Sequence, residues 1–249
     1  MTRHPWIVPD WPAPKQVRAL STTRHGGHSA APYASFNLSD YVGDAPDAVA
    51  RNRALLRAQA DLPAAPHWLR QVHGTSVLEL DNSANETAVP SEADAAVTMA
   101  RGVVCAVQTA DCLPILLCDA AGTRVGVVHA GWRGLANGVV EAALVRLDTR
   151  AEQTLAWLGP AIGPDAFEVG DDVRDAFVRG TPDASRWFRA HAPGKWRADL
   201  VQLARLRLQR AGITQIYGGG WCTFSDAQEF FSYRRDKVTG RMATLIWLE

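Results

Sequence analysis

The sequence lacks an excess of charge of either sign, since its 249 residues hold 26 Lys and Arg against 26 Asp and Glu. Nucleic-acid-binding proteins normally carry a basic excess on one face, so this balance argues against a nucleic-acid partner. A run of about 18 uncharged apolar residues, the minimum for a membrane helix, is also missing. The nearest candidate, residues 102–118, is interrupted by Asp111 and Pro114. We therefore expect no membrane span.

Cysteine is scarce as well, with four residues in a 27.0 kDa chain. A chain of this length can bury a full core and needs no disulfide framework. The first fifteen residues carry prolines and tryptophans where a signal peptide would have an apolar stretch, so we expect a reducing, cytoplasmic setting. Each cysteine is then a core residue, a metal ligand or a nucleophile. Cys105 and Cys118 lie within or at the end of apolar runs and fit the core reading best.

The remaining composition, 47% apolar and 21% charged, is that of a folded globular protein. Short apolar runs predict buried strands at 103–107, 113–117, 125–129 and 155–158. Weaker patterns predict a strand over 68–80 that is broken at Gly74, and strands at 213–217 and 242–248. Helices are predicted over 46–60, 136–147 and 199–211. This order predicts an α/β (mixed α+β) fold, with residues 1–249 forming a single compact domain that has a mixed sheet and flanking helices.

The strongest local feature is the segment VVHAGWRG at 127–134. A buried strand delivers His129 to its end, two glycines permit a tight turn, and a helix follows. Backbone N–H groups at the start of such a helix attract anions, and Arg133 could bind a phosphate or carboxylate through bidentate hydrogen bonds. An ordinary glycine turn with Arg133 in a surface salt bridge explains the pattern equally well.

Two further segments place reactive side chains at the ends of predicted strands. Asp111 and Cys112 lie between two apolar runs, where a simple turn would use Gly or Asn, and His73 lies just before a glycine. With His129 they offer two imidazoles and one thiolate, a known ligand set for a catalytic zinc with an open fourth position. The spacings of 39 and 17 residues form no local finger motif, so the fold would have to assemble the site. A cysteine in the core and unrelated histidines remain the simpler alternative.

Other segments are weaker candidates. His25 and His28 flank two glycines and could bind a metal, although a surface loop accounts for them as well. The segment 230–236, FFSYRRD, could hold a ring and an anion, or form a solvated turn before the last strand.

Taken together, the motifs resemble the YfiH family, whose members are described as laccase-like polyphenol oxidases, purine nucleoside phosphorylases and peptidoglycan editing factors. The shared motifs, in order, are TTRHGGHS (22–29), SFNL (35–38), VGD (42–44), NR (52–53), QVHG (71–74), TADCLPILL (109–117), HAGWRG (129–134), GPAIGP (159–164) and FFSYRRD (230–236). They cover nearly the whole chain. The resemblance implies a zinc ion held by His73, Cys112 and His129.

The resemblance also implies an activity, the phosphorolysis of adenosine, inosine or methylthioadenosine to free base and ribose 1-phosphate, with adenosine deamination as a further reaction. Zinc lowers the pKa of a bound water to about 7, which suits attack on a purine ring. Phosphorolysis needs a held phosphate and charge stabilisation. We expect Arg133 to bind phosphate, with Arg24 and Arg234 as additional anion contacts. Asp111 is expected to act as an acid/base or to orient a metal ligand.

Several alternatives stay open. A multicopper oxidase needs on the order of ten histidines, many as HxH pairs, whereas this chain has seven and no such pair. A single copper at the same three residues, with polyphenol oxidation, remains an alternative. So does an amidase acting on a peptidoglycan precursor, through the metal or through Cys112 as nucleophile. A non-catalytic metal protein would need a fourth protein ligand, for which Cys222 is available. We expect a monomer or a homodimer.

Overall fold

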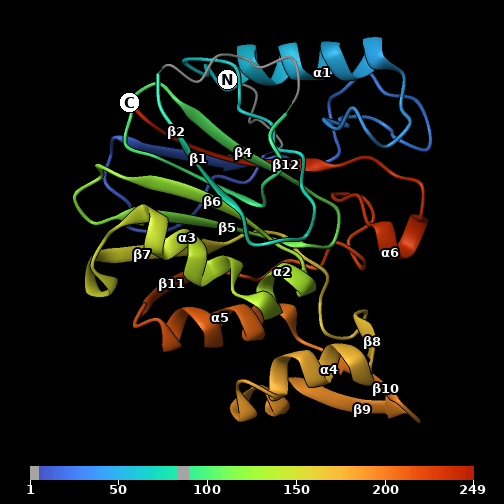
Figure 1. Cartoon of the computed structure of the whole chain (residues 1–249). Helices are drawn as coiled ribbons and strands as arrows, with labels where there is room; N and C mark the ends of the chain where they lie inside the picture. The colour runs from blue at the N-terminus through green and yellow to red at the C-terminus, as the bar shows by residue number, and fades with distance from the viewer. Residues whose placement is uncertain (1–5, 83–89) are drawn as a thin grey trace.

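Stacked β-sheets with helices on their outer faces organise the chain (Figure 1). The computed structural model describes residues 6–82 and 90–249, so the first five residues of the proline-rich amino-terminal segment lie outside the described part. The largest sheet has the order β11-β7-β5-β6-β3-β2. Its strands are β2 (Val77–Leu80), β3 (Ala95–Thr98), β5 (Leu113–Asp119), β6 (Val125–Ala130), β7 (Thr154–Leu158) and β11 (Gln215–Gly218).

Two smaller sheets and the helices complete the described fold. One sheet has the order β1-β12-β4 and the other the order β8-β10-β9. Their strands are β1 (Val17–Ser21), β4 (Val104–Thr109), β12 (Met242–Leu248), β8 (Glu168–Gly170), β9 (Phe188–Ala192) and β10 (Lys195–Ala198). The helices are α1 (Pro46–Gln59), α2 (Trp132–Asn137), α3 (Val139–Leu147), α4 (Asp171–Val178), α5 (Leu200–Arg210) and α6 (Tyr233–Asp236), with short 3-10 turns at η1 (Ala151–Gln153) and η2 (Pro182–Trp187).

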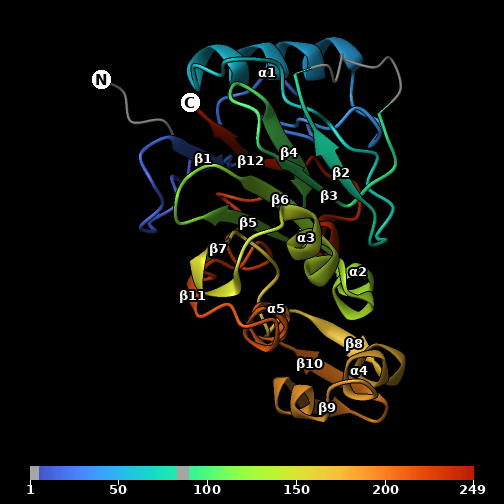
Figure 2. The same cartoon turned by 60° about the vertical axis from the view of Figure 1, so that its left-hand side comes forward.

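The six-stranded sheet packs against the β1-β12-β4 sheet. Strands β4, β5, β6, β7 and β12 of these two sheets are buried on both faces, which explains why they appear in the sequence as continuous apolar runs. Because side chains alternate along a strand, Leu116 and Val127 point into the core shared with the β1-β12-β4 sheet. Their neighbours Ile115 and Val128 point into the core formed with α3 and α5. The other face of the β1-β12-β4 sheet packs on α1 through residues such as Leu56. Figures 1 and 2 show the resulting order of helix, sheet, sheet and helices, with β8, β9, β10 and α4 at one end.

Most expected elements are confirmed with small shifts at their ends, but two were wrong. The strand expected at 68–80 is regular only from Val77 to Leu80, and residues 67 and 70 make isolated bridges. The helix expected at 136–147 is two helices, because Gly138 adopts a φ of 98° and ends the first one. The sequence patterns also missed the small β8-β10-β9 sheet, since β9 and β10 are short and largely exposed.

Within 6–82 and 90–249, no helix combines the length and apolar character needed to cross a bilayer.

The packing of the six-stranded sheet against the β1-β12-β4 sheet yields a stability prediction. Leu116 is fully buried in the core between them, so Leu116→Ala removes buried methyl groups and leaves a cavity. We expect the free energy of unfolding to fall by about 2–5 kcal/mol. Urea denaturation followed by circular dichroism measures this change. Val145→Ala on α3, at a side chain that is 81% exposed, is the control and should change stability little. Equal effects of both variants would contradict the assigned packing.

Candidate metal centre

The register of the largest sheet brings Cys112 and His129 to the same edge. Strands β5 and β6 are antiparallel, and Leu113 pairs with Ala130. Cys112, which directly precedes β5, therefore lies beside His129, the second-last residue of β6. Residues 17 positions apart in the sequence become neighbours because one strand begins where the other ends.

The next two strands bring the remaining groups to this edge. Strand β3 pairs with β6 so that Ala95 faces Val128, and the His129 N–H donates to the carbonyl of Asp94 at 2.7 Å. Strand β2 runs parallel to β3, so the turn before it, which carries His73, lies at the same end. Four segments distant in sequence thus converge on one edge of the sheet.

The ligand atoms of His73, Cys112 and His129 lie within 4.8 Å of one another. The Cys112 Sγ is 3.8 Å from Nε2 of His73, and the two imidazole rings meet edge to face with centroids 4.9 Å apart. His129 is buried, Cys112 is partly exposed and His73 is exposed. Among the described residues these three form the one cluster of His, Cys, Asp or Glu able to hold a metal, and it is open toward solvent.

A buried carboxylate, that of Asp94, holds two of these residues in place. Its Oδ1 lies 2.8 Å from Nδ1 of His129 and accepts the N–H of His73 at 2.9 Å. Its Oδ2 accepts the N–H groups of Val72 and Gly74 at 3.2 and 2.6 Å. With Nδ1 occupied by the carboxylate, Nε2 of His129 is the nitrogen left for a metal, which is the usual arrangement of metal-binding histidines.

The backbone is unusual at two positions in the site. His73 and Asp111 have φ angles of 60° and 92°, in the left-handed region that non-glycine residues rarely adopt. The three N–H bonds to Asp94 support the first position. At the second, the Asp111 carboxylate accepts the Thr223 hydroxyl at 2.7 Å and the Arg234 N–H at 2.6 Å. Asp111 thereby ties the Cys112 turn to two later loops.

Gly131 lets the segment after β6 approach the cluster closely. A Cβ at this position would lie 2.7 Å from Cδ2 of His73 and 3.1 Å from Sγ of Cys112. A side chain at this position would therefore have to displace the His73 ring and press on the Cys112 sulfur, which glycine avoids.

Charges within the cluster shift two pKa values. Burial by itself would raise the pKa of Cys112, but the charges and hydrogen bonds of His129 and His73 outweigh it and lower the pKa to about 6. Burial would lower the pKa of His129, but the Cys112 charge and the hydrogen bonds to Asp94 and Cys112 raise it to about 9. Near neutral pH the metal-free cluster therefore contains a thiolate beside an imidazolium.

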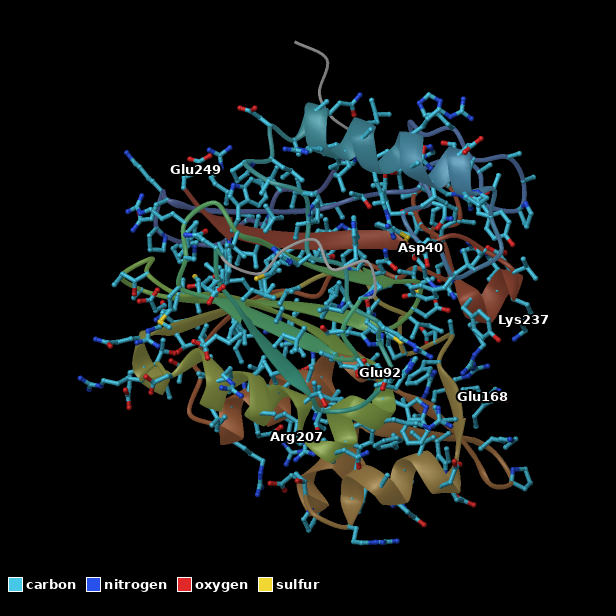
Figure 3. The ribbon with its side chains drawn as sticks, turned by 45° about the horizontal axis from the view of Figure 1, so that its top comes forward. Asp40, Glu92, Glu168, Arg207, Lys237 and Glu249 are labelled. Atoms are coloured by element: carbon cyan, nitrogen blue, oxygen red, sulfur yellow. The ribbon has the colours of Figure 1, made fainter. Side chains whose placement is uncertain are left out.

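The three arginines expected to contact an anion have different environments. Arg133 is exposed and stacks on Trp132, 4.5 Å from the ring centroid. Arg24 donates to the carbonyls of Ala34 and Ala227. Arg234 donates to the carbonyl of Glu168, which Figure 3 labels near the small sheet. Arg24 and Arg234 thus use part of their donor capacity on the backbone, whereas Arg133 has no hydrogen bond to the described residues.

The remaining cysteines and histidines lie outside the cluster. Cys105 and Cys118 are fully buried, and burial raises the pKa of each to about 12, which confirms them as core residues. Cys222 accepts the Gly163 N–H and is no part of the cluster, so the described residues supply no fourth ligand. His25 pairs with Glu229. Of the segment 230–236, Phe230 and Phe231 are core residues, so it is not simply a solvated turn.

Sequence reasoning missed Asp94, Arg241 and a nearby cavity. Asp94 is an isolated acid just before the apolar strand β3, which is the one signal that could have singled it out. Arg241 directly precedes β12, whose first residue, Met242, pairs with Thr109, so Arg241 lies close to the turn that carries Asp111 and Cys112. The cavity has a volume of about 400 Å³ and is lined by Asp40, Tyr41, Trp68, Leu69, Arg70, Gln71, Pro90 and Gln108. Figure 3 shows Asp40 and Lys237 toward the end of the sheets where α6 lies, with Glu249 at the other end.

Known proteins resemble this chain over nearly its whole length. Residues 18–249 match the family described as multi-copper polyphenol oxidoreductase laccase. A purine nucleoside phosphorylase of Pseudomonas aeruginosa is 52% identical over 245 residues, which cover 98% of each chain. The purine nucleoside phosphorylase YfiH of Escherichia coli K12 is 53% identical over 242 residues, which cover 97% of this chain and 98% of its own.

Solved structures share the architecture. A Neisseria meningitidis protein superposes with a TM-score of 0.93 at 49% identity and covers 98% of this chain and 99% of its own. YlmD from Geobacillus stearothermophilus superposes with a TM-score of 0.91 at 32% identity and covers 100% of this chain and 97% of its own. The expected mixed α/β fold is confirmed.

The close approach at Gly131 yields a prediction about metal binding. Gly131→Ala places a methyl group against His73 and Cys112, so we expect the affinity for zinc to fall about tenfold or more. Competition with a chromophoric chelator measures the affinity. The matched control is Gly220→Ala, because a Cβ there meets nothing within 4 Å. Unchanged zinc affinity in Gly131→Ala would contradict the role of the cluster.

The two shifted pKa values predict proton release on metal uptake. Near pH 7.5, Cys112 with a pKa of about 6 is already a thiolate, whereas His129 with a pKa of about 9 still carries its proton. A metal needs the neutral imidazole, so binding should release about one proton, and affinity should rise with pH up to about 9. Titration calorimetry in buffers of different ionisation enthalpy counts the protons. Binding without proton release at this pH would show that the imidazolium is absent.

Proposed function

Because the chain belongs to the YfiH family, we propose that it is a zinc-dependent purine nucleoside phosphorylase. The proposed reaction converts adenosine, inosine or methylthioadenosine and phosphate into free base and ribose 1-phosphate. The observation that carries the proposal is the open His73, Cys112 and His129 cluster, in a chain about half identical to relatives named purine nucleoside phosphorylase. We further propose that residues 1–249 act as one catalytic domain in the cytoplasm, as a monomer or homodimer.

The residues of the cluster suit a zinc ion. Two imidazoles and a thiolate are ligands that zinc prefers, and a catalytic site keeps a position open. The Asp94 carboxylate leaves Nε2 of His129 available, and the lowered pKa of Cys112 supplies the thiolate. When bound, zinc would supply Lewis acidity at the edge of the sheet. Copper also suits these ligands, so metal analysis is part of the test below.

The chain's own residues would position the substrates. Arg133 is exposed beside the cluster and is proposed to bind phosphate. Arg24 and Arg234 are proposed as additional anion contacts through the donors they do not use on backbone carbonyls. For Asp111 a positioning role is favoured over proton transfer, because both of its oxygens already accept hydrogen bonds.

The cavity near the cluster supports a purine substrate. Its volume of about 400 Å³ lies within the usual range for small-molecule sites. Tyr41 and Trp68 place aromatic rings at its wall, and Gln108 places a side-chain amide there. Gln71 also exchanges two hydrogen bonds with the backbone of Gln108, at 2.8 and 2.7 Å, which ties the cavity wall to the segment that carries His73.

Phosphate dependence tests the proposal. Purified protein of known metal content is incubated with inosine or adenosine, with and without phosphate, and the products are separated. We expect base release only with phosphate, and a loss of at least about a hundredfold in Cys112→Ala together with loss of the metal. Cys222→Ala, which alters a partly exposed thiol outside the cluster, should keep both activity and metal.

Other products would redirect the assignment. Ammonia released from adenosine without phosphate would show deamination as the main reaction. Turnover of an amide-linked cell-wall precursor, or oxidation of a phenol by the copper-loaded protein, with no phosphate-dependent base release, would contradict the phosphorylase.

A further inference from the structure

Arg241 is a partly buried arginine with no carboxylate partner among the described residues. Its Nη1 donates to the carbonyls of Thr239 and Gly240 at 2.9 and 3.0 Å, and its backbone N–H donates to Oδ1 of Asn37. These bonds fix the base of the side chain and one side of the guanidinium. The Nε and Nη2 groups make no hydrogen bond to any residue that the structure describes.

Strand register places Arg241 beside the metal-site residues, because the next residue, Met242, pairs with Thr109 just before the turn that carries Asp111 and Cys112. Burial lowers the pKa of Arg241, and the groups that act against this are Tyr41, Cys112, Asp111 and Tyr233. The Tyr233 ring lies beneath the guanidinium, with its centroid 5.8 Å away. Asp111 makes no ion pair with Arg241, and its two oxygens accept bonds from the Thr223 hydroxyl and the Arg234 backbone N–H.

A partly buried cation is normally paired with an anion, since its desolvation is otherwise uncompensated. We propose that Arg241 binds the phosphate co-substrate beside the His73, Cys112 and His129 cluster. The proposal rests on the proposed phosphorylase function and adds a residue that the sequence motifs did not single out. A guanidinium with Nε and Nη2 free presents two parallel donors, which match two oxygens of a phosphate.

Other arginines close to this region are already engaged. Arg53 pairs with Asp40 at 3.2 Å and donates to the carbonyl of Leu38. Arg235 pairs with Asp236 and donates to three backbone carbonyls. Arg241 differs from both because its remaining donors have no protein acceptor and its neighbours include a proposed metal ligand.

The position also relates the anion to the proposed purine cavity. Tyr41 is at once a wall residue of the cavity and the first of the groups that act on the Arg241 charge. Arg241 therefore lies within electrostatic range of a residue of the cavity wall and of a proposed metal ligand. A phosphate bound by Arg241 would be close to both the space proposed for the base and the proposed metal ligands, as phosphorolysis at the ribose requires.

The experiment uses the zinc-loaded full chain and inorganic phosphate as the probe. Arg241→Gln should raise the dissociation constant of phosphate, and its KM in base release, about tenfold or more, while zinc content and nucleoside KM stay within about twofold. Arg241→Lys keeps the charge but loses the paired donors, so we expect about threefold weaker phosphate binding. The control is Arg179→Gln, at an exposed residue that directly follows α4, and it should match the wild type.

The outcomes separate this inference from the function on which it rests. Phosphate-dependent turnover in the wild type with unchanged phosphate affinity in Arg241→Gln overturns the role of Arg241 alone. A wild type that neither binds nor needs phosphate overturns both. A purely structural arginine would lower the unfolding temperature without changing the stabilisation that phosphate adds. If Arg241→Gln does not fold, Arg241→Lys decides, and wild-type phosphate affinity in that variant overturns the proposal.

Discussion

The buried carboxylate of Asp94 is the interaction on which the candidate site depends. It accepts three successive backbone N–H groups, from residues 72 to 74, and faces Nδ1 of His129. One side chain therefore supports the left-handed backbone of His73 and fixes the ring of His129. Asp94 is fully buried, and these four contacts replace the water that would otherwise solvate its charge. Without solvent screening, the charge also acts strongly on the nearby imidazole. Its own pKa is lowered, since the hydrogen bonds outweigh the effect of burial.

The layered sheets give this interaction a rigid setting. Strands β5, β6 and β3 are buried on both faces, so their register is strongly specified and a slip of one residue would expose the core. The edge at which Cys112, His129 and Asp94 meet is consequently fixed by packing far from the site. Because Gly131 has no side chain, the segment after β6 passes close to the cluster without a steric clash. The packing of the core therefore fixes the positions of the site residues at the ends of these three strands.

The family description and the ligand set point to different chemistries. The matched family is described as a multi-copper laccase, whereas close relatives are named purine nucleoside phosphorylase. In the described residues one cluster of three ligands is present, which suits a single ion. A thiolate beside an imidazolium, a partly buried arginine and a cavity with aromatic wall residues are the features on which the proposed phosphorylase function rests. These features agree better with the phosphorylase name.

The sequence by itself determined the elements and the kinds of ligand. Doubly buried strands leave continuous apolar runs, and amphipathic helices leave a 3.6-residue period, so most elements could be located from local patterns. The motifs around His73, Cys112 and His129 supplied the ligand types. Only the tertiary structure decided that residues 72–74 form a turn, that Asp94 orients His129, and that Arg241 lies beside the turn that carries Cys112. The reason is physical: these contacts join residues 20 to more than a hundred positions apart, through strand register and burial that no local pattern encodes.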